Sequence, residues 1–163
     1  MNKAFISLGG NIGDRLENLK KAASYLSENA GSIIKSSTVY ETASWGKTDQ
    51  PNFLNQVLLL ETEYTSADLI KIILDIEEMM GRKRSFKNAS RVIDIDILFY
   101  NKQIIDQTSL KIPHPEIQNR RFVLIPLNEI AADFVHPVLN EKITALLYSC
   151  KDTLAVNLYN QEK

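Results

Sequence analysis

Helix-like and strand-like segments alternate in a regular order over residues 4–100, and this order constrains the fold more than any other feature. Apolar residues recur at helical spacing over residues 14–28 and 65–80, as in helices that bury one face. Apolar or β-branched runs predict strands at residues 4–8, 33–40, 53–62 and 92–100. The resulting order, βαββαβ, is that of a split βαβ unit. The sequence therefore predicts an α+β protein with a ferredoxin-like core, an antiparallel sheet with helices packed on it, and C-terminal additions.

Local signals predict the helix starts, the turns and the C-terminal segments. Asp14 stands three residues before Glu17, which is the spacing of a capping pair at a helix N-terminus. The glycine-rich residues 9–13 predict a turn between a strand and a helix. They are not expected to form a phosphate-binding loop, because Asp14 stands where such a loop needs Lys-Ser or Lys-Thr. Beyond residue 100 the sequence predicts a proline-punctuated loop and short helical pieces near residues 127–131 and 141–149.

Composition describes one ordinary globular domain. The chain has 163 residues, a formal net charge of −1 and 44% hydrophobic residues, so we predict a single domain over residues 1–163 with a loose tail after about residue 152. The single Cys150 excludes an intramolecular disulfide framework and a multi-cysteine zinc module, which fits a reducing, cytoplasmic compartment. Neither a membrane-spanning run nor a signal-peptide core is expected. The near-zero charge argues against a nucleic-acid partner, and a monomer is expected.

The most informative chemical feature is a basic segment followed by two aspartates. The cations are Arg82, Lys83, Arg84, Lys87 and Arg91, with no acid between them. Asp94 and Asp96 alternate with an apolar set that we expect on the core face, namely Ile93, Ile95, Ile97 and Phe99. Both carboxylates then share the opposite face, about 6.6 Å apart along the strand. Mg²⁺ uses one or two carboxylates and completes its shell with water and phosphate, and arginine matches phosphate oxygens. This pattern favours a Mg-nucleotide site over a solvated basic loop.

Three further side chains are candidates for the same ligand. Glu77 lies in the last turn of the second predicted helix, where the helix dipole disfavours an anion. His114 stands between two prolines, which hold its backbone extended. Arg120 and Arg121 follow close behind; one of them is the third candidate, and the other is expected to face solvent. A histidine beside an arginine suits a phosphate partner, and from these residues alone a purely structural histidine is equally compatible.

Trp45, Phe53 and Asn55 form a third group. Phe53 and Asn55 occupy alternate positions of a predicted strand, so their side chains share one face. Phe53 can stack on a flat ring, and Asn55 can both donate and accept hydrogen bonds along that ring's edge. Without other information, a core aromatic residue and a turn asparagine are the simpler interpretation.

Four ordered motifs resemble the 6-hydroxymethyl-7,8-dihydropterin pyrophosphokinase family of folate biosynthesis. They are residues 7–15, 49–55, 87–98, and 112–115 with 120–127. With the segments around them they cover most of the chain, from residue 5 to about residue 131. The resemblance implies the family's ferredoxin-like fold. It also implies a Mg²⁺-dependent transfer of pyrophosphate from ATP to the hydroxymethyl group of a reduced pterin, with release of AMP.

The resemblance also implies roles for single residues. Asp94 and Asp96 would hold two Mg²⁺ ions, and Arg82 and Arg91 would act on the phosphates during transfer. The ATP-binding residues would be Glu77, Arg82, Arg84, Arg91, His114 and Arg120. The pterin pocket would consist of Thr42, Ala43, Trp45, Phe53, Asn55 and Phe122, with Phe53 and Phe122 on opposite ring faces. Two positions differ from the family pattern. Residues 83–90 contain no tryptophan, and Leu74 stands where a glutamine is frequent, so adenine recognition would depend more on backbone groups.

Two other classes of protein share parts of this pattern. A non-catalytic ferredoxin-like module that binds RNA would be basic and would carry stacking aromatics on its central strands. The net charge of −1 and the two aspartates oppose that interpretation. A divergent relative that binds both ligands without reaction is the other alternative, and the retention of Arg82, Arg91, Asp94 and Asp96 argues against it.

Overall fold

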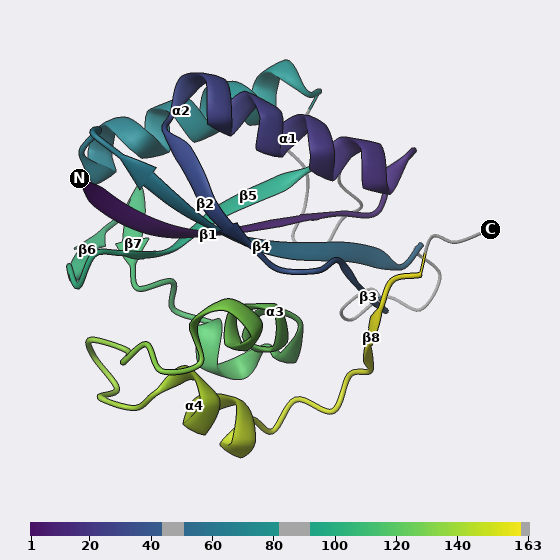
Figure 1. Cartoon of the computed structure of the whole chain (residues 1–163), viewed down its shortest axis with the longest axis vertical. Coiled ribbons are helices and arrows are strands. Elements are labelled where there is room, and N and C mark those ends of the chain that lie inside the picture. The colour runs from purple at the N-terminus through teal and green to yellow at the C-terminus, as the bar shows by residue number, and fades with distance from the viewer. Residues whose placement is uncertain (44–50, 82–91, 161–163) are drawn as a thin grey trace.

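The computed structural model describes residues 1–43, 51–81 and 92–160, and it consists of an antiparallel sheet between two layers of helices (Figure 1). The first half contains β1 (Asn2–Gly10), α1 (Arg15–Asn29), β2 (Ser32–Ser36), β3 (Tyr40–Thr42), β4 (Phe53–Thr62), α2 (Ser66–Met79) and β5 (Asp94–Tyr100). The second half contains β6 (Ile105–Gln107), β7 (Leu110–Ile112), a 3-10 turn (Ile117–Asn119), α3 (Arg121–Ala131), α4 (Ile143–Ser149) and β8 (Val156–Leu158).

The main sheet has the strand order of a ferredoxin-like fold. β1 lies between β5 and β4, β4 pairs with β2 and β3 on its other side, and every pairing is antiparallel. The helices α1 and α2 cover one face of this sheet, whereas α3 and α4 cover the other (Figure 1). The predicted fold class is therefore confirmed.

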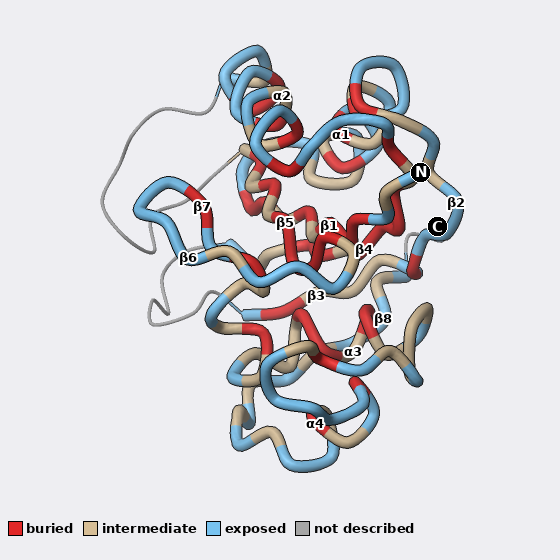
Figure 2. Tube along the Cα trace, turned by 90° about the vertical axis from the view of Figure 1, so that its left-hand side faces the viewer, coloured by how far each residue is buried: buried red, intermediate tan, exposed pale blue. Residues whose placement is uncertain are grey.

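Each face of the sheet buries its own hydrophobic core. The core between the sheet and the helices α1 and α2 includes Ile6, Leu26 and Ile73, none of which is exposed. The core beneath α3 and α4 includes Phe99 and Leu124. Figure 2 shows that the buried positions follow β1, β4 and β5 between the two helical layers. Full burial of one such side chain contributes about 1.5–3 kcal/mol, so both layers hold the sheet firmly.

Local signals explain the two helices of the predicted core. The side chain of Asp14 accepts a hydrogen bond from the Glu17 backbone N–H at the start of α1, at 3.1 Å. Thr65 caps α2 in the same way, and Gly81 follows the end of α2 with φ of 91°. Both helices therefore begin and end within a residue or two of the positions that the sequence predicts. Within the described residues, no helix is long and apolar enough to cross a membrane.

The alternation predicted for β5 holds only for its first half. Phe5 pairs with Phe99 while Ile6 pairs with Ile97, so the register shifts at Leu98 and leaves a β-bulge. Beyond the bulge the faces exchange: Phe99 joins the core beneath α3, and Tyr100 joins the core beneath α1 and α2. The prediction that Phe99 shares the face of the isoleucines is therefore wrong.

Two boundaries also differ because a partner strand decides them. Gly9 and Gly10 do not form the predicted turn; they extend β1, paired with Asn55 and Leu54. The predicted strand over residues 33–40 is split into β2 and β3 at Ser37. The Ser37 hydroxyl accepts a hydrogen bond from the backbone N–H of Val57 at 3.0 Å, in place of a backbone carbonyl. Side-chain competition of this kind interrupts a ladder.

The C-terminal half is more regular than predicted. The helix expected near residues 127–131 begins earlier, at Arg121, and it contains Pro126. The tail predicted to be loose after about residue 152 contains β8, which pairs antiparallel with β3. The prediction of a loose tail is therefore wrong for residues 156–158. The edge of β3 supplies their backbone hydrogen-bond partners, and a local sequence pattern cannot predict a partner so far away in the chain.

Burial of His136 predicts a pH-dependent stability. The residue is 4% exposed, and its Nδ1 atom accepts hydrogen bonds from the backbone N–H groups of Val138 and Leu139, each at 3.1 Å. Burial lowers the pKa of His136 below its usual value. The unfolded chain then binds this proton more readily, so stability is present above a pH of about 6.5 and is lost as pH falls toward the folded pKa.

We expect the melting temperature of the wild type to fall more steeply below a pH of about 6.5 than that of His136→Asn. Thermal unfolding of both proteins at a series of pH values checks this result. The half-buried His114, whose pKa is also lowered by burial, is present in both proteins, so their difference isolates His136. Parallel pH profiles would contradict the prediction.

Candidate active site

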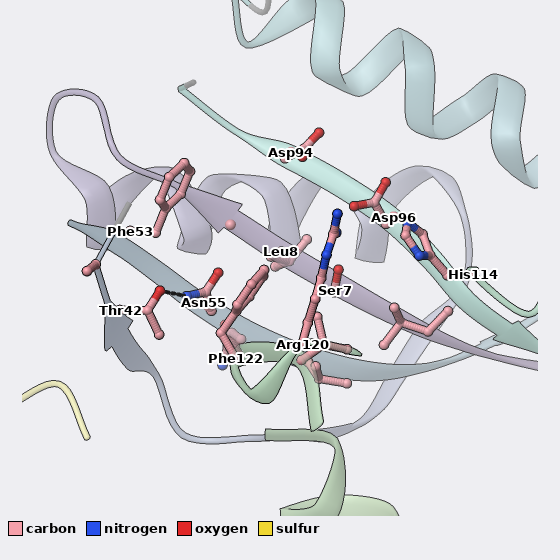
Figure 3. Close-up of a pocket in the computed structure, with 16 residues that line it drawn as sticks. Ser7, Leu8, Thr42, Phe53, Asn55, Asp94, Asp96, His114, Arg120 and Phe122 are labelled. Atoms are coloured by element: carbon pink, nitrogen blue, oxygen red, sulfur yellow. Dashed lines mark hydrogen bonds between the residues drawn. The ribbon is translucent and has the colours of Figure 1, made fainter. Parts of the chain in front are cut away.

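A single pocket joins most of the candidate site residues that the structure describes. It has a volume of about 190 Å³ and lies between the α3 side of the sheet and the first turn of α3 (Figure 3). Its lining consists of Ser7, Leu8, Gly9, Thr42, Ala43, Phe53, Asn55, Gln56, Val57, Asp94, Asp96, Leu98, His114, Arg120, Phe122 and Val123. The lining thus comes from six separate segments of the chain and includes acidic, basic and aromatic residues.

Strand register sets the order of groups across the pocket floor. Gly9 on β1 pairs with Asp94 on one side and with Asn55 on the other. Ser7 pairs in the same way with Asp96 and Val57. Neighbouring strands are about 4.8 Å apart, so β1 separates the carboxylate row from the Asn55 row by about 10 Å. A ligand in the pocket therefore meets carboxylates at one end and an amide at the other.

Asp94, Asp96, His114 and Arg120 make up the charged end. His114 is held by its own backbone, whose N–H donates to the Leu98 carbonyl at 2.9 Å. Its Nδ1 atom accepts from the Glu116 N–H at 3.1 Å, so in neutral His114 the proton sits on Nε2. Burial, and then the Arg120 charge, lower the pKa of His114, which favours this neutral form.

Glu77 supports the aspartate strand from the opposite side. It is 3% exposed, and its Oε2 atom accepts a hydrogen bond from the Ile95 N–H at 2.7 Å. Ile95 lies between Asp94 and Asp96, so this bond fixes the backbone that carries both carboxylates. Glu77 is absent from the described lining of the pocket. Its predicted contact with ATP stays a prediction.

Thr42, Asn55, Phe53 and Phe122 make up the other end. The Asn55 amide N–H donates to the Thr42 hydroxyl oxygen at 2.9 Å, and both side chains are buried. That bond fixes the orientation of the amide and leaves its carbonyl oxygen next to Gly9. Phe53 comes from β4 and Phe122 from α3, so aromatic side chains reach this end from two different elements (Figure 3).

The first motif of the chain anchors the segment that leads into β4. The Asn11 amide donates to the Pro51 carbonyl at 3.1 Å, and the Arg15 guanidinium donates to the Asn52 carbonyl at 2.9 Å. Arg15 also forms a 2.7 Å ion pair with Glu41 on β3. These contacts position the backbone immediately before Phe53.

The predicted site residues cover most of this pocket but not its floor on β1. Ser7 and Gly9 line that floor and were not predicted, although a polar residue and a glycine at alternate positions of a strand are a usable signal. Leu74 is 54% exposed on α2. The predicted residues Trp45, Arg82, Arg84 and Arg91 lie outside the described residues.

A methyl group at Gly9 would disturb Asn55. An added Cβ atom at this position would lie 2.9 Å from Asn55 Oδ1, closer than van der Waals contact allows. Because Asn55 is tied to Thr42, we expect Gly9→Ala to weaken binding of a ring at this end about tenfold or more. Titration with the pterin proposed below measures the effect. Lys3→Ala, an exposed position on the same strand, is the control, and equal affinities of the two variants would contradict the prediction.

The charged end contains two carboxylates, which suit a magnesium site whose remaining ligands come from water and from the substrate. Asp94 and Asp96 both line the pocket from one strand face. Among the described residues, no group of three or more histidine, cysteine, aspartate or glutamate side chains could hold a metal ion by itself. Mg²⁺ commonly takes one or two carboxylates and obtains its remaining ligands from water and phosphate oxygens. The two aspartates therefore fit Mg²⁺ bound together with a phosphate chain.

Fold and site together define a class: a ferredoxin-like α+β protein whose pocket suits a metal-bound phosphate chain at one end and a flat heteroaromatic ring at the other. A family model described as 7,8-dihydro-6-hydroxymethylpterin-pyrophosphokinase (HPPK) matches residues 5–132. The chain belongs to this family, as the motif resemblance predicts.

Named relatives are similar over most of the chain. A 2-amino-4-hydroxy-6-hydroxymethyldihydropteridine pyrophosphokinase of Aquifex aeolicus is 41% identical over 143 residues, which are 88% of this chain and 89% of the relative. One of Methylorubrum extorquens is 40% identical and covers 83% of this chain and 86% of the relative. The folic acid synthesis protein FOL1 of Dictyostelium discoideum is 40% identical over 85% of this chain, which matches only 21% of that longer protein.

Solved structures agree with the fold. The HPPK-DHPS protein of Plasmodium falciparum superposes with a TM-score of 0.73 at 20% sequence identity. The match covers 90% of this chain and 43% of that one, so this chain spans less than half of the solved structure.

Proposed function

We propose that the pocket described above is the active site of this pyrophosphokinase. The enzyme transfers pyrophosphate from ATP to the hydroxymethyl group of 6-hydroxymethyl-7,8-dihydropterin in folate biosynthesis, giving the pterin diphosphate and AMP. The observation that carries the assignment is the register of β5, β1 and β4. It places the aspartates and Asn55 on one sheet face, with only the side chains of β1 between them. An acceptor hydroxyl can therefore lie beside the phosphates while its ring stays at the Asn55 end.

Asp94 and Asp96 would hold Mg²⁺, two ions by the family resemblance, and the phosphates of ATP would supply further oxygen ligands. Bound Mg²⁺ supplies charge neutralisation to the phosphate oxygens. The protein's part is to hold both carboxylates on one rigid strand, and the Glu77 hydrogen bond to Ile95 contributes that rigidity.

His114 and Arg120 are proposed to bind the triphosphate of ATP. The Nε2–H of neutral His114 is a donor, and the Arg120 guanidinium presents a planar fork that matches phosphate oxygens. By their positions in the family motif, Arg82 and Arg91 are proposed to act on the phosphates during transfer, and Arg84 and Glu77 are proposed to bind ATP. In the transfer the pterin hydroxyl oxygen bonds to the β-phosphorus and gives up its proton. The bond from that phosphorus to the oxygen retained by AMP breaks at the same time. Such a reaction needs positioning and charge neutralisation more than covalent help.

The other end of the pocket is proposed to bind the pterin. Phe53 and Phe122 would contact its two faces, since they approach from β4 and α3. Asn55, oriented by Thr42, would hydrogen-bond along the ring edge. By the family resemblance, Ala43 and Trp45 are proposed to belong to the same pterin site. We further propose that the protein works as a cytoplasmic monomer on these small molecules alone, without nucleic acid or membrane. A formal net charge of −1 and a single unpaired cysteine support this proposal.

Product analysis tests the proposed function directly. Purified protein is mixed with ATP, Mg²⁺ and 6-hydroxymethyl-7,8-dihydropterin, and the adenine nucleotide formed is identified. Pterin-dependent AMP without ADP is the expected result. ADP would indicate an ordinary kinase, and binding of both ligands without turnover would indicate a relative that has lost the chemistry.

A further inference from the structure

The first turn of α3 obtains its cap from a distant part of the chain. Arg120, the residue at the N-cap position, makes no side-chain capping bond. The Arg121 N–H donates instead to Asp152 Oδ2 at 3.0 Å, while Asp152 Oδ1 accepts from the Leu154 N–H at 2.9 Å. A carboxylate at a helix N-terminus satisfies an otherwise free N–H group and interacts favourably with the helix dipole. This turn carries Phe122 and Val123 into the pocket.

The same segment continues to the opposite wall of the pocket. After Asp152 the chain runs past α3 to β8, which lies beside β3 (Figure 1). Val156 pairs with Thr42, and the Tyr159 N–H donates to the Val39 carbonyl at 2.9 Å. Because β3 has three residues, pairing on both of its edges matters more to its position than it would for a longer strand. β3 carries Thr42, the partner that orients Asn55.

Tyr159 connects this segment to the approach of β4. The Arg15 guanidinium lies 5.5 Å from the centre of the Tyr159 ring. Arg15 is the residue that also binds Glu41 on β3 and the Asn52 carbonyl before Phe53. Residues 152–159 therefore contact, directly or through one side chain, the elements that present Phe122, Thr42 and Phe53.

We propose that residues 152–159 form a strap that fixes the separation of the two walls at the pterin end, with Asp152 as a positioning residue for pterin binding. The strap touches neither the pocket interior nor the reacting atoms. It acts through Phe122 on one wall and through Thr42 and Asn55 on the other. The inference rests on the proposed function because it takes these side chains as the pterin contacts.

The test compares Asp152→Ala with a destabilised variant that leaves the pocket alone. Thr62→Val is the matched control, since Thr62 also exchanges side-chain hydrogen bonds with backbone groups, at the far end of β4. Binding of 6-hydroxymethyl-7,8-dihydropterin is measured by calorimetry with Mg²⁺ and α,β-methylene-ATP, an analogue whose α–β phosphate bridge cannot be cleaved. Melting temperatures are measured alongside.

We expect Asp152→Ala to raise the pterin Kd about tenfold, and Thr62→Val to change it less than about twofold. Asp152→Asn keeps an oxygen that can accept from Arg121, so its Kd is expected within about threefold of the wild type. Asn157→Pro removes the β8 N–H that faces Glu41 on β3, so it is expected to weaken pterin binding as Asp152→Ala does. An unchanged Kd in folded Asp152→Ala, or an equal rise in Thr62→Val, would overturn the proposal.

Failure of the proposed function gives a different result. If the wild type forms no AMP with this pterin, the function is wrong whatever the variants do. Amide hydrogen exchange at residues 121–124 then decides whether the strap positions α3. Faster exchange in Asp152→Ala than in Thr62→Val supports the strap, and equal exchange overturns it.

Discussion

Asp94→Asn and Asp96→Asn are each expected to lower kcat by about a thousandfold or more while the protein stays folded. The amide has nearly the shape of the carboxylate, so β5 and its Glu77 support are retained. The amide carries no negative charge, however, and is a poor ligand for a hard divalent cation. Because both aspartates line the pocket from one strand face, neither is expected to substitute for the other.

The measurement is steady-state AMP formation over a range of Mg²⁺ concentrations, with pterin binding measured separately. Pterin affinity is expected to change little, because β1 lies between the aspartates and Asn55. Asp106→Asn is the matched control, since its carboxylate is 83% exposed in the β6–β7 hairpin and pairs with Lys111. A turnover near that of the wild type in either active-site variant would end the metal assignment.

Asn55→Leu is expected to raise the KM for the pterin by about a hundredfold or more, with little change for ATP. Leucine has the same number of side-chain heavy atoms and the same branching, so the buried position stays filled and the protein should stay folded, with a melting temperature lowered by the unpaired Thr42 hydroxyl. The expected loss of pterin affinity has a chemical cause, because the polar groups on the pterin edge that face Asn55 would enter the pocket without a hydrogen-bond partner. The Thr42 hydroxyl would lose its partner as well. A site that hydrogen-bonds its substrate loses much of its affinity when such groups are left unpaired.

Pterin and ATP dependence of AMP formation, measured in separate titrations, checks this result. Asn29→Leu, at an exposed position at the end of α1, controls for the general effect of the substitution. Equal losses of pterin and ATP affinity would indicate that Asn55→Leu disturbs the sheet as a whole. An unchanged pterin KM would place the ring elsewhere in the pocket.

The predictable part of the fold depends on neighbours in sequence. The helices α1 and α2 follow from apolar spacing and from caps such as Asp14, because a helix satisfies its hydrogen bonds within its own segment. Asp94, Asp96, Phe53 and Asn55 were found by the same reasoning, since side chains alternate along a strand regardless of its partner.

The errors occur where one strand depends on another. The bulge at Leu98 exists because β5 must match β1, and Ser37 ends β2 because it bonds to Val57. The sequence around Gly9 predicts a turn, but Gly9 pairs with Asn55 and therefore belongs to β1. The pairing partners lie far away in the sequence, so a pattern of neighbouring residues predicts the wrong structure at these positions.

By itself, the sequence determined the order of helices and strands in the core and the family, and it predicted the side chains proposed for the chemistry, because periodicity, caps and motifs are properties of short segments. Only the tertiary structure decided that Gly9 separates the aspartates from Asn55, and that Asp152 caps a helix 31 residues away. Both arrangements depend on pairing between segments distant in sequence. The register of such pairing depends on which side chains are buried between the sheet and its two helical layers. The conformational preferences of a single segment do not determine it.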